Sequence, residues 1–276
     1  MQYGMIIDLE RCVGCHACTI ACKAEWEVPV EFYRNWVFRM GPSLVGNEMT
    51  STYYPGLCNH CTEPVCVPEC PADPVDMTFT NFKTGETTTM EVAATWKDPF
   101  DGTVQIDKDR CIGCGACVDA CPYNARYINP ALVDDASEDG KADKCTYCKP
   151  RVEAGFDPAC VQTCITNARI FGDLDDPNSE VAKYVTKGAR GIEPKGGQLG
   201  PNSRYYGKKK DMTLLFNSHT PELADLAQVR RRAMLASMVK PAMKKIKNLG
   251  LLGIVGALMA KELLEQEDRN KAEPLS

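Results

Sequence analysis

Two short apolar runs along the chain are followed by the same polar pattern. The segment "IIDLERC" begins at Ile6, and the segment "VQIDKDRC" begins at Val104. In both, the apolar run is followed by an Asp and then by a charged residue directly before Arg-Cys. Short runs that lead into a loop in this way predict strands. Their repetition predicts two modules built on one plan, with short strands and short helices in each. The pattern therefore favours an α+β fold.

Two further segments carry local signals of structure. Residues 73–102 are rich in Thr, with polar and apolar positions that alternate around a Lys-Thr-Gly-Glu turn, and this predicts a β-hairpin insertion. After Cys164, "ITNARIFGDLDDPNSEVAKYV" predicts a short strand, a helix cap between Asp176 and Ser179, and a helix.

These signals divide the chain into three parts. We expect a main domain over 1–187, an extended surface segment over 188–221 that begins rich in Gly and Pro, and a mostly helical tail over 222–276. The tail contains the apolar run Leu249–Ala260, which is shorter than the roughly twenty residues of a spanning helix. It predicts a helix buried against a partner or the protein's own body, or an anchor at a membrane surface. We expect the tail to dock to a partner or a membrane.

Composition excludes several classes of protein. The 276 residues suffice for one large or two small domains, and the 25% of charged and 44% of apolar residues are ordinary for globular proteins. A net charge of -5 gives no basic surplus for nucleic acid. The chain is long enough to bury a core without disulfides, and its first residues lack the basic start and long apolar run of a signal peptide. We therefore expect thiols loaded with metal in a reducing cytoplasm, from which a folded metalloprotein can still be exported with a partner.

The cysteines carry the main chemical signal, because all sixteen fall into four motifs of four. Motifs 1 and 3 have the spacing C-x2-C-x2-C-x3-C, motif 2 has C-x2-C-x4-C-x3-C and motif 4 has C-x2-C-x11-C-x3-C. A [4Fe–4S] cluster takes four thiolates, so the count predicts four [4Fe–4S] clusters and a role in electron transfer. We expect the fourth cysteine of motifs 1 and 3 to open a short helix. Motif 1 is Cys12, Cys15, Cys18 and Cys22; motif 2 is Cys58, Cys61, Cys66 and Cys70; motif 3 is Cys111, Cys114, Cys117 and Cys121; motif 4 is Cys145, Cys148, Cys160 and Cys164.

Glycine and proline residues within the motifs suit such clusters. Gly14, Gly113 and Gly115 allow the backbone to approach a cluster closely and to adopt positive φ. Pro71 and Pro122 follow the fourth cysteines of motifs 2 and 3, as in bacterial ferredoxins. In such runs the fourth cysteine ligates the other cluster of a pair.

Other metal chemistry fits less well. Two C-x2-C pairs make a zinc ribbon, and motif 4 alone would be compatible with one, but zinc does not need the triplet of motifs 1 and 3. A zinc-loaded structural module that bridges partners is therefore the first alternative. A stand-alone reductase is the second alternative. However, the sixteen cysteines fill all sixteen ligand positions of four clusters and leave no iron free to bind a substrate, and no acid–base pair is recognisable. His16 and His60 are interpreted as loop residues, because the cysteine ligands are already complete.

The four motifs in this order resemble the iron–sulfur (β, electron-transfer) subunits of the dimethyl sulfoxide reductase family of molybdopterin oxidoreductases. Relatives include the subunits of polysulfide, thiosulfate, tetrathionate and arsenate reductases and of formate dehydrogenases. The resemblance covers about Tyr3–Val185, and Ile165 departs from the proline usual after the last cysteine. It rests on "CVGCHACTIACKAE", "CNHCTEPVCVPECP", "CIGCGACVDACPYNARY", "DKCTYC" and "PACVQTCITNARIFGDLDDPNSEV".

The resemblance implies two packed two-cluster ferredoxin-type modules in which the motifs exchange their fourth cysteines. It also implies a molybdopterin catalytic subunit and a membrane quinone-reactive subunit as partners, with no nucleic acid and no small-molecule substrate. The chain would then be a peripheral subunit of a membrane-associated complex, on the cytoplasmic face or in the periplasm by co-export, and not itself an enzyme. The implied ligand sets are A, with Cys12, Cys15, Cys18 and Cys164; B, with Cys22, Cys145, Cys148 and Cys160; C, with Cys58, Cys61, Cys66 and Cys121; and D, with Cys70, Cys111, Cys114 and Cys117.

Overall fold

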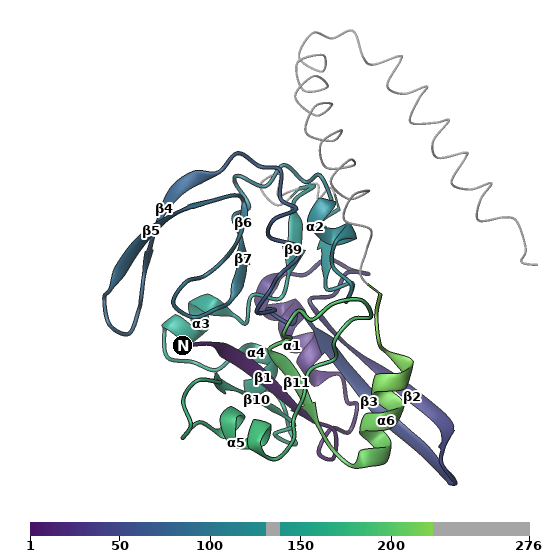
Figure 1. The fold of residues 1–276 in the computed structure, drawn as a ribbon. Coiled ribbons are helices and arrows are strands. Elements are labelled where there is room, and N and C mark those ends of the chain that lie inside the picture. The colour runs from purple at the N-terminus through teal and green to yellow at the C-terminus, as the bar shows by residue number, and fades with distance from the viewer. Residues whose placement is uncertain (131–138, 223–276) are drawn as a thin grey trace, which may run out of the picture. The chain divides into compact units, whose positions relative to one another are not determined.

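A small mixed sheet of three strands holds the two ends of the cysteine-rich region together (Figure 1). Strand β1 (Tyr3–Asp8) is central, with β10 (Arg169–Asp173) antiparallel on one side and β11 (Ser203–Tyr206) parallel on the other. The computed structural model describes residues 1–130 and 139–222, all within the first of two units, Met1–Ala233 and Met234–Ser276. The apolar run of the predicted tail lies outside the described residues.

Strand β1 forms because its apolar run can be buried on both faces. Met5, Ile6 and Ile7 are all 0% exposed. Side chains alternate between the faces of a strand, so Ile6 packs towards helix α5 (Glu180–Thr186) while its neighbours pack into the main core. The sheet thereby fixes the position at which motif 1 begins, directly after β1.

Residues 1–130 and 139–222 also form four two-stranded ladders, and each joins strands that are neighbours in the sequence. Figure 1 shows the two longest as hairpins that extend from the body, one of them between motifs 2 and 3. The ladders are β2 (Asn35–Val45) with β3 (Glu48–Leu57), β4 (Val75–Thr80) with β5 (Thr87–Val92), β6 (Thr95–Lys97) with β7 (Val104–Ile106), and β8 (Arg126–Ile128) with β9 (Ala142–Lys144).

The helices begin earlier in the motifs than we expected. Helix α1 starts at Ala17 and α2 at Ala116, each one residue before the third cysteine of its motif, so the fourth cysteine does not open the helix. The cause is the preceding residue, because His16 and Gly115 adopt left-handed backbone angles that redirect the chain into the helix. The six helices of the described residues are α1 (Ala17–Trp26), α2 (Ala116–Asp119), α3 (Lys149–Glu153), α4 (Ala159–Gln162), α5 and α6 (Lys209–Ser218).

Residues 188–221 differ from the expected extended surface segment. They contribute β11 to the central sheet and form α6, which packs against β2 and β3. Burial explains the difference, since Tyr205 is 2% and Leu215 0% exposed within the main core. This segment therefore belongs to the same folded body as the motifs.

Candidate metal centre

The sixteen cysteines all lie within the described residues, and none forms a disulfide. Only Cys15 is exposed, while the others are buried or half-buried. Thiols that are spaced for ligation and withdrawn from solvent are typical of cluster sites.

Thiols of motifs 1 and 4 come together although up to 152 residues separate them (164 − 12). Burial raises the pKa of Cys12, and Cys18 and Cys164 raise it further. Burial, followed by Cys160 and Cys148, raises the pKa of Cys22 to about 12. These thiols are therefore electrostatic neighbours within sets A and B.

Thiols of motifs 2 and 3 come together in the same way. Burial raises the pKa of Cys121 to about 12, and Cys66 and Cys58 add to the rise. Burial also raises the pKa of Cys114, as do Cys117 and Cys70. These thiols are therefore electrostatic neighbours within sets C and D.

Electrostatic coupling between the thiols of different sets follows one order. Burial raises the pKa of Cys160 to about 11, and Cys18 of set A contributes. Cys145 of set B is raised well above its usual pKa by burial and by neighbours that include Cys58 of set C. Burial and Cys117 of set D raise the pKa of Cys66 in set C. The sets thus succeed one another as A, B, C and D.

Hydrogen-bond donors are directed at the sulfur atoms. The backbone amides of Ala142 and Ala168 donate to Cys111 Sγ at 3.3 Å and Cys164 Sγ at 3.2 Å. The Trp26 indole N–H donates to Cys148 Sγ at 3.2 Å. Burial would raise the pKa of Cys164, but amide and hydroxyl donors lower it below its usual value. Donors of this kind favour thiolates, the form that binds metal.

Gly14 shows how closely the protein wraps motif 1. Its φ is +68°, and a Cβ atom there would stand 2.2 Å from the ring of Tyr53. A side chain at this position would therefore have to displace the ring as well as adopt an unfavourable backbone angle.

Three buried cations stand beside the thiols, and the sequence did not lead us to expect them. Arg126 and Arg169 are 4% exposed and Lys144 is 0% exposed. Long basic side chains are almost always at the surface, so composition alone gives no sign of this. A signal does exist, because motifs 3 and 4 both end in C-x2-N-A-R, at Arg126 and Arg169.

A buried ion network anchors the strand that leads into motif 4. Asp143 on β9 accepts two hydrogen bonds from Arg34, both of 2.8 Å, and one of 2.8 Å from Lys108. Burial would raise the pKa of Asp143, but these two cations hold it below its usual value. The Arg34 guanidinium also lies 4.6 Å from the ring centre of Trp26, which donates to motif 4. The network thus joins motifs 1 and 4.

His60 has a structural role within the described residues. Its ring stacks on Tyr147 at 3.8 Å between centroids, and its Nδ1 accepts from the Val104 amide at 3.0 Å. The two rings occupy the same place in motifs 2 and 4, directly before the second cysteine. The stack therefore fixes motif 2 against motif 4. This agrees with the interpretation of His60 as a loop residue.

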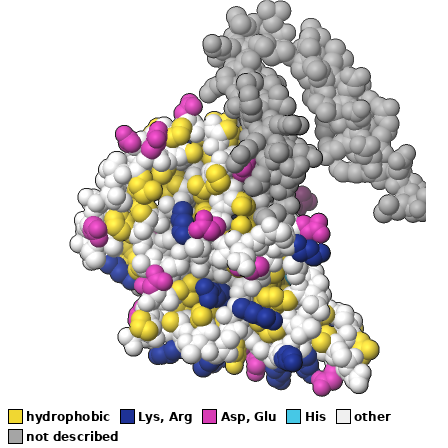
Figure 2. All heavy atoms as spheres, in the orientation of Figure 1, with side chains coloured by type: hydrophobic (Ala, Val, Ile, Leu, Met, Phe, Trp, Pro, Cys, Tyr) yellow, Lys and Arg dark blue, Asp and Glu magenta, His cyan; other side chains and the backbone are white. Residues whose placement is uncertain are grey.

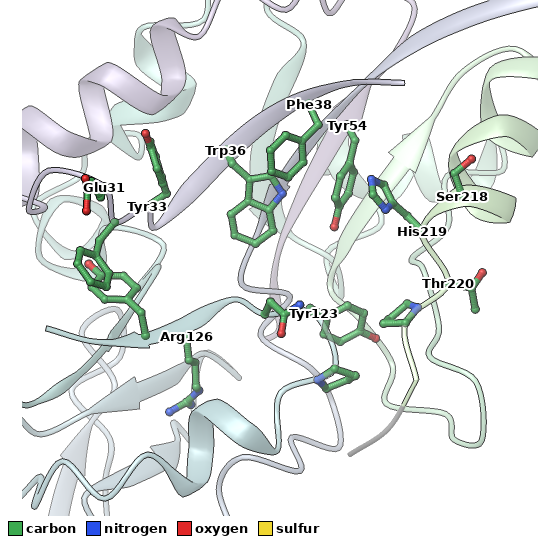
Figure 3. A pocket seen from close by; sticks show the side chains of 15 residues that line it. Glu31, Tyr33, Trp36, Phe38, Tyr54, Tyr123, Arg126, Ser218, His219 and Thr220 are labelled. Carbon is green, nitrogen blue, oxygen red and sulfur yellow. The ribbon is translucent and has the colours of Figure 1, made fainter. Parts of the chain in front are cut away.

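An aromatic pocket of about 600 Å³ lies beside the end of motif 3. Figure 3 shows Trp36, Phe38 and Tyr54 on one wall, with Tyr123 and Arg126 on the other. On the face that Figure 2 shows, apolar and charged side chains both reach the surface.

The residues present fit an iron–sulfur cluster. Arg126 Nη2, Arg169 Nη2 and His60 Nε2 are buried and have no hydrogen-bond partner within the described part of the chain. Buried donors of this kind suit an anionic group, and cysteine-ligated clusters are held by thiolates and by such hydrogen bonds. Across residues 1–130 and 139–222, no three His, Cys, Asp or Glu side chains stand close enough to hold a single metal ion.

Comparison with known proteins gives the same picture. Residues 49–174 match the 4Fe-4S dicluster domain family, and residues 3–24 match a 4Fe-4S binding domain. A Halobacterium salinarum protein, provisionally named as the iron-sulfur subunit of a dimethyl sulfoxide reductase, is 37% identical over 77% of this chain and 86% of its own length. The chain belongs to the iron–sulfur subunits of the dimethyl sulfoxide reductase family.

Other relatives of this iron–sulfur subunit are named for sulfur-compound reductases. A tetrathionate reductase subunit of Salmonella typhimurium is 42% identical over 67% of this chain and 63% of its own length. The thiosulfate reductase electron transfer subunit of Salmonella typhi is 40% identical over 67% of this chain and 81% of its own length.

The family names establish the coarse role. This protein is an iron–sulfur electron-transfer subunit of a reductase complex, and its cofactors are iron–sulfur clusters. No helix of the described residues is both long and apolar enough to span a bilayer.

Proposed function

We propose that this subunit holds four [4Fe–4S] clusters, one on each of the sets A to D, and passes single electrons along the row A–B–C–D. The electrostatic coupling between thiols of successive sets is the observation that supports it most. When bound, the clusters supply one-electron oxidation and reduction.

The chain's own residues hold and shield the thiolates. Burial withdraws the sulfur atoms from solvent, and the donors at Ala142, Ala168 and Trp26 stabilise their charged form. Because all sixteen cysteines are engaged, no iron is left open to a substrate. The chain thus performs no substrate chemistry of its own.

The row would join a molybdenum or tungsten bis-pterin catalytic subunit to a membrane quinone-reactive subunit or another redox partner. The names of the relatives support this arrangement, since they describe subunits of reductases, one of them expressly an electron transfer subunit. Residues 222–276 would dock the chain to such a partner or to the membrane, and the subunit would be peripheral.

The test is metal and sulfide analysis of the full chain after anaerobic purification, with absorption spectra before and after dithionite. We expect about sixteen irons and sixteen sulfides per chain, with a brown band that bleaches on reduction. Zinc in place of iron would make the chain a structural module, and turnover of a substrate by the isolated chain would make it a reductase.

A further inference from the structure

Each junction of the row A–B–C–D contains one buried cation. Burial alone would lower the pKa of Arg169, but thiolates of sets A and B, Cys18 and Cys160 foremost, raise it. Arg169 Nη1 lies 3.9 Å from Cys160 Sγ. Arg169 therefore stands at the junction of sets A and B.

The same holds at the far end of the row. Burial alone would lower the pKa of Arg126, but thiolates of sets C and D, Cys66 and Cys117 foremost, raise it. The wall of the aromatic pocket includes Arg126 (Figure 3). Arg126 is 4% exposed, and its Nη2 has no hydrogen-bond partner within the described residues, so this buried cation lies beside thiols of both sets at the junction of C and D.

Lys144 occupies the middle junction. It directly precedes Cys145 of set B, and its Nζ donates to the Cys145 carbonyl at 2.8 Å and to the Val104 carbonyl. Burial lowers its pKa, whereas Cys58 of set C and Cys145 act in the opposite direction. Each of the three junctions between successive sets therefore has one buried cation.

None of the three has a carboxylate partner within the described residues. Their charged neighbours are thiolates, other cations and, for Arg169, a tyrosine. A buried charge that lacks a partner of opposite charge destabilises the fold much more than an unpaired charge at the surface does. A protein that keeps three such cations in its interior must compensate them with negative charge, and the thiolate-bound cofactors carry that charge.

The two arginines are placed by the same local device. Arg126 opens β8 and Arg169 opens β10, each five residues after the fourth cysteine of its motif. The Asn two residues earlier has a left-handed backbone in both cases, with φ of 51° at Asn124 and 52° at Asn167. Equivalent turns thus direct equivalent arginines to the junction within each module.

We propose, on the basis of the four-cluster function above, that Arg169, Lys144 and Arg126 act as counter-charges: they stabilise the negative charge that each transferred electron adds to the neighbouring clusters. Each electron that enters the row adds negative charge, and a fixed cation in a poorly solvated interior stabilises that charge. Each cation therefore raises the midpoint potentials of the two clusters beside it. Sets B and C each adjoin two cations, and sets A and D each adjoin one.

The experiment is a redox titration of the full, iron-loaded chain, followed by electron paramagnetic resonance. Arg126→Met, Lys144→Met and Arg169→Met remove the charge and keep much of the side-chain volume. We expect two of four reduction steps to shift to lower potential in each variant, with C and D, B and C, and A and B affected respectively. Arg39→Met, at an exposed position of β2, is the matched control and leaves all four steps unchanged.

The remaining outcomes also decide the question. If the unsubstituted chain lacks four reduction steps, the proposed function fails, whereas four steps that do not respond to these variants overturn only the counter-charge role. Equal shifts of all four steps also overturn it. Where a Met variant does not retain its iron, Arg126→Lys and Arg169→Lys decide. If the Lys variants retain all their iron and the original potentials, the positive charge is what the site needs. If the Lys variants also lose iron, the arginines have a packing role instead.

Discussion

At the scale of single residues, the interior of this protein is organised by charge as much as by apolar packing. Asp143 is bound by Arg34 and Lys108 at one side of the motifs. Lys149 at the start of α3 binds Asp98 at 2.9 Å and also Asp101. Both networks hold motif 4 in place through side chains that are 24% exposed or less.

Replacement of Asp143 by Asn should destabilise the fold by about 3–5 kcal/mol, because Arg34 would remain buried without its anion. The depressed pKa of Asp143 means that its contribution is complete above the pKa of the unfolded chain and disappears as pH falls through the lower folded value. The measurement is guanidinium unfolding, followed by fluorescence at several pH values from neutral to acid. Asp175→Asn, at an exposed side chain, is the control and should change little. Equal stability of Asp143→Asn and its parent at neutral pH would contradict the prediction.

Replacement of Cys114 by Ser should remove one cluster, and with it roughly four of about sixteen irons, because a hydroxyl is a poor substitute for a thiolate ligand. Iron analysis and electron flow from a quinol analogue to substrate in the assembled complex are the measurements. Val13→Ser, at an exposed position of motif 1, introduces the same side chain without touching a ligand. Unchanged electron flow in the Cys114 variant would exclude a relay through set D.

At the scale of elements, short helices and strands aim the ligands. Helix α5 covers one face of the central sheet, and its first turn is capped by Ser179, whose hydroxyl accepts from the Ala182 amide at 3.1 Å. The same hydroxyl donates to the Asp173 carbonyl at 2.6 Å, at the end of β10. One side chain thus connects the helix to the strand that follows motif 4.

Replacement of Ser179 by Ala should lower the free energy of unfolding by about 1 kcal/mol, the usual cost of losing a helix cap. Lys183→Ala, on the exposed side of the same helix, should be nearly neutral. Denaturant unfolding of both variants measures the difference. An effect of the same size in both would mean that the cap contributes nothing specific.

Elements with a local signal could be predicted from the sequence, and elements set by distant contacts could not. The apolar run at Ile6 and the cap at Ser179 are local, and the structure has β1 and α5 there. Strand β11 is short and lies in a Gly- and Pro-rich stretch, and it exists because it pairs with β1 almost 200 residues away. Likewise the cysteine motifs are readable by spacing, whereas Lys144 becomes part of the site only through its burial.

At the scale of the whole molecule, the described residues form the electron-transfer body, and the predicted docking function falls on residues 222–276. Deletion of Met243–Ser276 should leave the iron content unchanged and remove the chain from the membrane-bound complex, because the apolar run would be lost. Co-purification with the complex and iron analysis test this. Deletion of Asn270–Ser276 alone keeps the apolar run and should preserve attachment. A complex that assembles normally at the membrane without residues 243–276 would exclude the docking role.

The pairing of β1 with β10 and β11 has a consequence for biosynthesis. Every thiol of the proposed sets C and D lies between residues 58 and 121, so these sets would be complete on a growing chain before motif 4 has been translated. The proposed set A needs Cys164, and the sheet that carries motif 1 needs residues up to Tyr206. The first cysteines to leave the ribosome are therefore among the last to find their final neighbours. Until then, the cell must keep the thiols of motif 1 reduced and free of the wrong metal.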